Sequence, residues 1–230
     1  MSASDDLRPL RRLALLLALG TASILLVMVA VGLVTGASQE AHEHYKLPAD
    51  YARDLVAQGD AARLMFGLDI GFLVLYTAFF AALARYLHAL GHTTARPFAW
   101  LGFGAMAIVA VLDIIENHHI LSLLSLAEHG RPIDDSAIAF QEVLSSTKFS
   151  ISYLSLFLFG IAIPRTTRLG WALCLFLTVA NVLTGVLGFA APAGLRAELD
   201  NGRWIGFLLG FGLAMLWLRS APDRASEPPG

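Results

Sequence analysis

The 230-residue chain is 57% hydrophobic and 15% charged, with a formal net charge of −2 at pH 7. Soluble domains carry about 25% charged residues, so this composition excludes an ordinary soluble domain and indicates an integral membrane protein. The slightly acidic balance does not support binding to nucleic acid or another polyanion. The single cysteine, Cys174, excludes a disulfide bond within the chain.

Long apolar runs follow one another along most of the chain. Each run is close to the roughly 20 residues that a helix needs to span a bilayer. We therefore predict one all-α domain, residues 1–218, in which six transmembrane helices form a bundle at about residues 13–34, 64–90, 98–124, 137–163, 169–190 and 204–218. Between the first two spans, residues 35–62 are predicted as a polar loop with a short interfacial helix from Asp50 to Asp60. The Pro-, Ser- and charge-containing residues 219–230 are predicted as a disordered tail.

The distribution of basic residues predicts the orientation of the bundle. If both termini are cytoplasmic, the inner segments hold nine arginines and the outer loops hold six basic residues. Because the inner loops are also shorter, the positive-inside rule favours this orientation. The strong preference for arginine over lysine is typical of a GC-rich bacterial genome, so the expected location is the bacterial inner membrane as a multi-pass protein.

Ionisable residues interrupt the third predicted span at Asp113-Ile-Ile-Glu116-Asn117-His118-His119. Such residues within a spanning helix are costly and indicate a functional site. Asp113, Glu116 and Asn117 have helical spacing i, i+3 and i+4 and so share one face, while His119 flanks it. With 1.5 Å of rise per residue, Asp113 lies roughly 15 Å from the outer end of this span and Glu116 roughly 11 Å.

Three other predicted spans carry polar groups to similar depths. Lys148 lies roughly 16 Å from the outer end of the fourth span, which matches Asp113, and Glu142 matches Glu116 and His119. The second span adds Asp69 and the fifth adds Asn181. We therefore predict one polar cluster in the outer half of the membrane, made by Asp69, Asp113, Glu116, Asn117, His119, Glu142, Lys148 and Asn181.

The cost of buried charge predicts how the cluster is paired. A charged residue at a helix centre costs about 2.5–3.5 kcal/mol on insertion scales, so these groups cannot all be ionised and unpaired. We predict that Asp113 pairs with Lys148. Glu116 and Glu142 then compete for a proton, a cation or His119, which suits proton exchange or cation binding.

Three functions remain open. The first is binding or transport of a proton, cation or small polar ligand. The second is a membrane enzyme that acts on a lipid or small substrate, with a divalent metal bound by Glu116, His119, Glu142 and Asp69. The third is a non-catalytic membrane subunit or assembly factor, in which the cluster only joins helices.

Two cofactor classes are not expected. Histidines at matching depth for a bis-histidine haem are missing, and so is a phosphate-binding glycine loop for a nucleotide. His42 and His44 in the first outer loop could bind a metal, although an inert exposed pair is the simpler interpretation.

The surroundings of Glu116 should discriminate between these functions. Asp69, Glu142 and His119 within ligand distance of Glu116 would indicate a site, whereas saturation by Lys148 and serines would indicate a structural link. Besides the lipid bilayer, the expected partner is a second copy of the chain, because Gly202, Gly206 and Gly210 form a small-residue ridge that lets helices approach closely. Packing within the bundle is the alternative use of this ridge.

Overall fold

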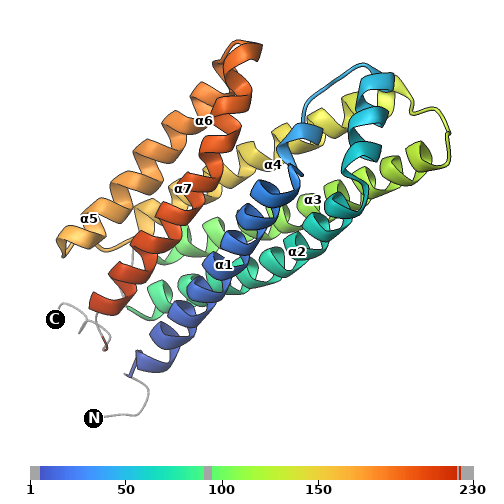
Figure 1. The fold of residues 1–230 in the computed structure, drawn as a ribbon. Helices are drawn as coiled ribbons and strands as arrows, with labels where there is room; N and C mark the ends of the chain where they lie inside the picture. The colour runs from blue at the N-terminus through green and yellow to red at the C-terminus, as the bar shows by residue number, and fades with distance from the viewer. Residues whose placement is uncertain (1–5, 91–94, 222, 224–230) are drawn as a thin grey trace.

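The computed structural model describes residues 6–90, 95–221 and 223, and gives only the backbone of residues 193–201. All the elements of this part of the chain are helices, as predicted (Figure 1). Five of them are long and apolar enough to cross a membrane: α1 (Arg8–Thr35), α2 (Pro48–Ala89), α3 (Ala95–Glu128), α4 (Asp135–Ala162) and the continuous stretch Arg168–Ala190. The membrane class predicted from composition therefore agrees with the lengths and apolar character of these helices.

The last helix, α7, differs from the prediction at its start. It runs over Ala193–Ser220, so its backbone is helical through residues that were predicted as a loop before a span at 204–218. It is not among the five helices that meet the length and composition requirement. The predicted tail begins at residue 219, but the helix continues to Ser220. Asp223 then forms an ion pair with Arg11 of α1, with 2.9 Å between Arg11 Nη2 and Asp223 Oδ1. Residues 222 and 224–230 of that tail lie outside the described residues.

The polar segment between α1 and α2 is folded against the bundle. α1 ends at Gly36, whose φ of 71° is the left-handed conformation that glycine adopts readily and whose N–H bonds the Gly32 carbonyl. A 3-10 turn, η2 (Glu40–His42), follows. The predicted interfacial helix and second span form one helix, α2, with non-helical backbone at Gly59, where φ is 28°. The kink allows the first turns of α2 to lie across the end of the bundle (Figure 1).

The fifth predicted span is built from three segments. α5 (Arg168–Leu175) begins after Thr167, whose hydroxyl accepts the Gly170 N–H, and it continues through the π-helical turn η3 (Phe176–Ala180) into α6 (Asn181–Ala190). π-helical turns within helices are frequent at functional sites. Here the turn packs on α4 so closely that a Cβ at Gly160 would lie 2.6 Å from Thr178 Cγ2.

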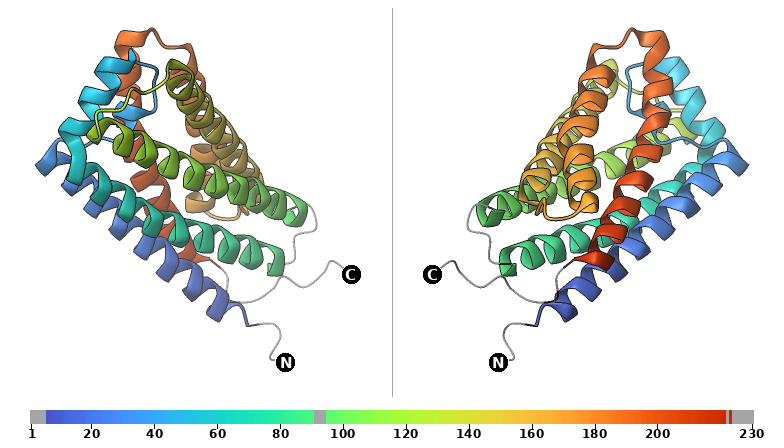
Figure 2. Two further views of the ribbon diagram at one scale, coloured as in Figure 1. Left: turned by 90° about the vertical axis from the view of Figure 1, so that its right-hand side faces the viewer. Right: turned by 90° about the vertical axis from the view of Figure 1, so that its left-hand side faces the viewer.

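The helices form two groups, α1 to α4 and α5 to α7, which enclose the interior. α1, α2, α3 and α4 pack in chain order, and α7 returns to α1 on one side and to α5 and α6 on the other (Figure 2). The interface between α3 and α4 is close at Gly102, whose carbonyl accepts the Ser155 hydroxyl at 2.7 Å. The main apolar core lies between these groups and contains an aromatic set from α2, α4 and α7, namely Phe72, Tyr76, Phe79, Phe80, Phe159 and Phe211.

Candidate functional site

An ion pair between α3 and α4 is the centre of the site. Lys148 Nζ lies 2.9 Å from Asp113 Oδ1 and also contacts Glu116 Oε2. All three residues are buried, and Glu116 has no exposed surface. The predicted pairing of Asp113 with Lys148 is therefore confirmed. Since the three side chains come from facing helices, the pair ties α3 to α4.

Side chains of α4 contact both carboxylate oxygens of Glu116. Gln141 Nε2 donates to Glu116 Oε1 at 2.9 Å, and the Ser145 hydroxyl donates to the same oxygen. Gln141, Ser145 and Lys148 have helical spacing i, i+4 and i+7, so one face of α4 contacts Glu116. Glu116 is thus saturated by a lysine, a serine and an amide, which is the pattern expected of a structural link.

Asp69 lies beside this link in a different environment. Its Oδ2 accepts a hydrogen bond of 2.6 Å from Asn117 Nδ2, and Asn117 Oδ1 accepts one of 3.4 Å from Gln39 Nε2. Only 4% of Asp69 is exposed. Within the described part of the chain, no lysine, arginine or histidine lies within ion-pair distance of this carboxylate. The hydrogen bond to Asp69 Oδ2 therefore comes from a neutral amide, that of Asn117.

The charges of the buried cluster do not balance. Asp69, Asp113 and Glu116 are three carboxylates, and Lys148 is the cation that contacts two of them. Full ionisation would leave the group with a net charge of −2, which is costly in the interior of a protein. Tyr76 reduces this cost slightly, because its hydroxyl donates to Asp113 Oδ2 at 3.4 Å. Full ionisation of all three carboxyl groups is therefore disfavoured.

A second buried ion pair lies at the end of the bundle where η2 meets α7. Arg203 Nη2 lies 2.6 Å from Glu43 Oε2, with exposed side-chain fractions of 11% and 4%. The guanidinium also lies 3.9 Å from the centre of the Phe149 ring, which Lys148 approaches from 4.8 Å. This pair fixes the polar segment against α4 and α7. Residues 42–44 are therefore part of the bundle, and the interpretation as an inert exposed pair does not hold for His42.

Burial alters the acid–base properties of the segment itself. Burial is the main reason that the pKa of His42 is lowered, although the hydrogen bond to Gln58 acts in the opposite direction. Burial is also the main reason that the pKa of Glu40 is raised, and the charge of Glu43 raises it further. Tyr51 anchors the turn because its hydroxyl donates to the His42 carbonyl at 3.1 Å.

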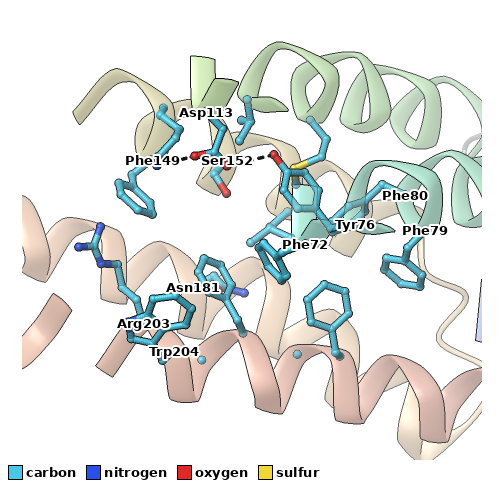
Figure 3. A pocket seen from close by; sticks show the side chains of 18 of the residues that line it. Phe72, Tyr76, Phe79, Phe80, Asp113, Phe149, Ser152, Asn181, Arg203 and Trp204 are labelled. Atoms are coloured by element: carbon cyan, nitrogen blue, oxygen red, sulfur yellow. Dashed lines mark hydrogen bonds and ion pairs between the residues drawn. The ribbon is translucent and has the colours of Figure 1, made fainter. Parts of the chain in front are cut away.

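A cavity of about 120 Å³ connects the two charged groups with the aromatic core. Asp69, Asp113 and Lys148 line one end together with Glu43 and Arg203. Figure 3 shows Asp113 and Tyr76 on one wall, with Arg203 and Trp204 of α7 on the facing wall. The rest of the lining is mostly apolar and rich in aromatic rings, with Gln39, Glu40, Ser152 and Asn181 as its further polar members. The site is therefore an amphipathic cavity within the bundle, charged at one end and apolar along its length.

Some predicted site residues do not join the cluster. His119 is half-buried; its Nε2 lies 3.0 Å from the Ala137 carbonyl and its ring packs edge-on against Phe140. Glu142 lies on a neighbouring hollow with His44 and Ser146, because Gln141 occupies the position on α4 that faces Glu116. Asn181 reaches the wall of the cavity, and its Nδ2 donates to the Phe176 carbonyl at 3.4 Å.

The predicted metal set is not brought together. Among the residues that the structure describes, no group of three or more His, Cys, Asp or Glu side chains could hold a metal ion. The physical reason is the rotation of α4, which directs Gln141, Ser145 and Lys148 rather than Glu142 at Glu116. Asp69 and Glu116 share the cluster, whereas His119 and Glu142 face elsewhere.

The three glycines of the predicted ridge on α7 differ in how closely other residues approach them. Gly210 packs within the molecule, since an added Cβ would lie 3.1 Å from the Phe176 ring. Gly206 lines the cavity, and an added Cβ there or at Gly202 would meet no atom within 4 Å. A contact between two copies through Gly202 and Gly206 stays a prediction.

Sequence reasoning missed several residues that build the site. Gln39 and Glu43 were assigned to a polar loop, and Tyr76, Gln141 and Arg203 were not included in the cluster. Gln141 had a readable signal, because it precedes Ser145 and Lys148 by four and seven residues on one helical face. Glu43 had none, since its burial depends on how the segment folds back onto α7.

Comparison with known proteins adds no assignment. No family model matches the chain, and neither a curated protein nor a solved structure matches it.

Proposed function

We propose that the protein is a multi-pass protein of the bacterial inner membrane, with six spans and both termini in the cytoplasm. α7 would be the sixth span. The ion pair of Arg11 with Asp223 supports this proposal, because it joins the start of α1 to the residues after α7. That proximity favours an even number of crossings, and the excess of inner arginines favours the cytoplasmic side.

We further propose that the cluster binds and exchanges a proton or small cation, with Asp69 as the exchanging group. The observation that carries this proposal is the charge imbalance of three buried carboxylates against one lysine. Asp69 is the member without a cationic partner in the described part of the chain, and it lines the cavity. Acidic groups within membrane helices commonly mark such pathways.

A structural role for the other carboxylates is the second candidate. Glu116 contacts Lys148, Ser145 and Gln141 and has no exposed surface. Because saturation of Glu116 by Lys148 and serine was predicted for a structural link, these contacts favour a link between helices at Glu116. The two candidates divide the cluster, because Glu116 serves packing while Asp69 serves exchange. A metal-dependent enzyme finds no comparable support in the arrangement of His119 and Glu142.

Infrared spectroscopy tests the proposal directly, because a protonated carboxylic acid has a C=O band separate from those of carboxylates. We expect the purified protein in lipid to show a buried acid band that titrates with pH and is removed by Asp69→Asn. Glu116→Gln should leave this band while lowering thermal stability. Glu128→Gln, which alters an exposed carboxylate paired with Arg63, is the matched control.

Uptake measurements test the exchange itself. In proteoliposomes with a trapped pH-sensitive dye, we expect Asp69→Asn to abolish proton or cation flux and Glu128→Gln to leave it unchanged. An acid band and a flux that both persist in Asp69→Asn would refute the assignment of Asp69. If no variant of Asp69, Asp113 or Glu116 alters either signal, the purely structural role would stand.

A further inference from the structure

We propose that the cavity binds a hydrophobic organic cation, whose charged nitrogen meets Asp69 and whose apolar body lies along the aromatic wall. This inference rests on the proposed function, because it names the class of cation that the site takes. It is drawn from the shape of the cavity, the charge at its end and the chemistry of its walls.

The cavity is elongated along the bundle. Asp69 and Leu83 both line it, and they are fourteen positions apart on α2. With 1.5 Å of rise per residue, the lining extends over about 20 Å along the bundle. The cavity is therefore an elongated channel along the bundle. An elongated ligand with a polar head and a slender apolar body fits this shape.

The walls of the channel are rich in aromatic rings. α2 contributes four of them, α4 and η3 contribute one each, and α7 contributes three, so rings from α2 and α7 face one another across the cavity (Figure 3). Aromatic faces carry negative potential and attract cations, in addition to burying apolar surface. The nine rings are those of Phe72, Tyr76, Phe79, Phe80, Phe149, Phe176, Trp204, Phe207 and Phe211.

The charge at the polar end selects the sign of the ligand. Lys148 is already paired with Asp113 and Glu116, and Arg203 is paired with Glu43. Asp69 is 96% buried, lines the channel and has only the Asn117 amide as a hydrogen-bond donor among the described residues. A cationic head would reduce the net charge of the cluster, whereas an anionic head would increase it and a neutral head would leave it unchanged.

Three probes with one body separate these cases. They are 4-phenylbutylammonium, 4-phenylbutanol and 4-phenylbutanoate, which share a phenyl ring on a four-carbon chain and carry a positive, a neutral and a negative head. Isothermal titration calorimetry of the full chain in lipid nanodiscs should show saturable binding of the ammonium probe and no saturable binding of the other two. Equal binding of all three, or of none, would overturn the inference.

Two pairs of variants locate the binding. Asp69→Asn should weaken the ammonium probe by at least about tenfold, whereas Glu128→Gln should not change it. Gly206→Phe should block the channel, since an added Cβ at Gly206 meets no atom within 4 Å and the position lines the cavity. Gly212 is on the same helix, and an added Cβ there also meets no atom within 4 Å, but the residue does not line the cavity. The Gly212→Phe variant should therefore bind the ammonium probe normally. Unchanged affinity in both Asp69→Asn and Gly206→Phe would overturn the inference.

The infrared signal separates this inference from the function on which it rests. A titrating acid band that depends on Asp69, with no selective binding of the ammonium probe, would overturn the organic cation alone and leave proton exchange in place. Selective binding of the probe that depends on Asp69, with no such band, would support the organic cation and remove the proton as the exchanged species. When both occur, binding should release a proton, and calorimetry in two buffers of different ionisation enthalpy measures its number.

Discussion

Lys148 extends its ammonium to within 2.9 Å of Asp113 Oδ1, so an ion pair joins α4 to α3 inside the bundle. The same ammonium contacts Glu116, which makes Lys148 the cation shared by two buried carboxylates. Removing one partner of a buried pair leaves an uncompensated charge, which is much more costly than losing a surface pair. The two lysines of the chain allow this difference to be measured.

We expect Lys148→Met to lower the free energy of unfolding by about 3–5 kcal/mol, because Asp113 and Glu116 lose their cation. Lys46→Met is the control, since Lys46 pairs with Asp54 at 2.8 Å while both side chains are about one-third exposed. That change should cost no more than about 1 kcal/mol. Reversible unfolding in detergent micelles, followed by circular dichroism, measures both values. Similar losses in the two variants would contradict a special role for Lys148.

The pair of Glu43 with Arg203 should behave as a coupled unit. We expect a double-mutant cycle with Glu43→Gln and Arg203→Met to give a coupling energy of at least about 1.5 kcal/mol, because Glu43 is buried and Arg203 is largely buried. The exposed pair of Arg63 with Glu128 is the matched control and should couple by at most about 1 kcal/mol. Thermal unfolding of the four proteins in each cycle supplies these energies. A coupling near zero for Glu43 with Arg203 would show that the segment is held by other contacts.

The ion pair of Asp113 with Lys148 could be predicted from the sequence, whereas the side chains that surround Glu116 could not. Asp113 and Lys148 were predicted to pair because the depths of two antiparallel helices can be compared by counting residues. Depth does not determine rotation about the helix axis, so Glu142 was placed where Gln141 and Ser145 lie. A rotation of one position on a helix is 100°, which is enough to exchange one side chain for another.

The folded segment between α1 and α2 shows a different limit. Its polar residues have the composition of an exposed loop, yet Gln39, His42 and Glu43 are buried. Their burial depends on contacts with α2, α3 and α7 that are distant in sequence, such as the hydrogen bond from Gln39 to Asn117. Local composition contains no information about such contacts. The helices themselves were predictable, because apolar runs of sufficient length determine them.

The raised pKa of Glu40 predicts a pH-dependent stability. Burial is the main cause of the shift, so the folded state holds the proton of Glu40 more tightly than the unfolded state does. The contribution of Glu40 is therefore fully present below its unfolded pKa and is lost as pH rises through the raised folded pKa. We expect Glu40→Gln to be more stable than the native protein at pH 7 and to lose this advantage at pH 4. Melting temperatures across this range measure the effect.

Ser38→Ala is the matched variant for this test. The Ser38 hydroxyl donates to Glu40 Oε2 at 2.7 Å and acts to lower the pKa of Glu40, so its removal should raise that pKa further. The stability of Ser38→Ala should consequently fall more between pH 4 and pH 7 than that of the native protein. Identical pH profiles for the native protein, Glu40→Gln and Ser38→Ala would contradict the assigned burial of Glu40.

The proposed six crossings predict which ends of the helices share a side of the membrane. In a Cys174→Ser background, we expect a cysteine at Arg8 or Ser220 to react with an impermeant maleimide from the cytoplasmic side only. A cysteine at Arg131, in the turn between α3 and α4, should react from the opposite side. All three positions are exposed, so access is decided by the membrane and not by packing. Labelling of Arg8→Cys and Ser220→Cys from opposite sides would show that α7 does not cross, and the ion pair of Arg11 with Asp223 could then not form in the membrane.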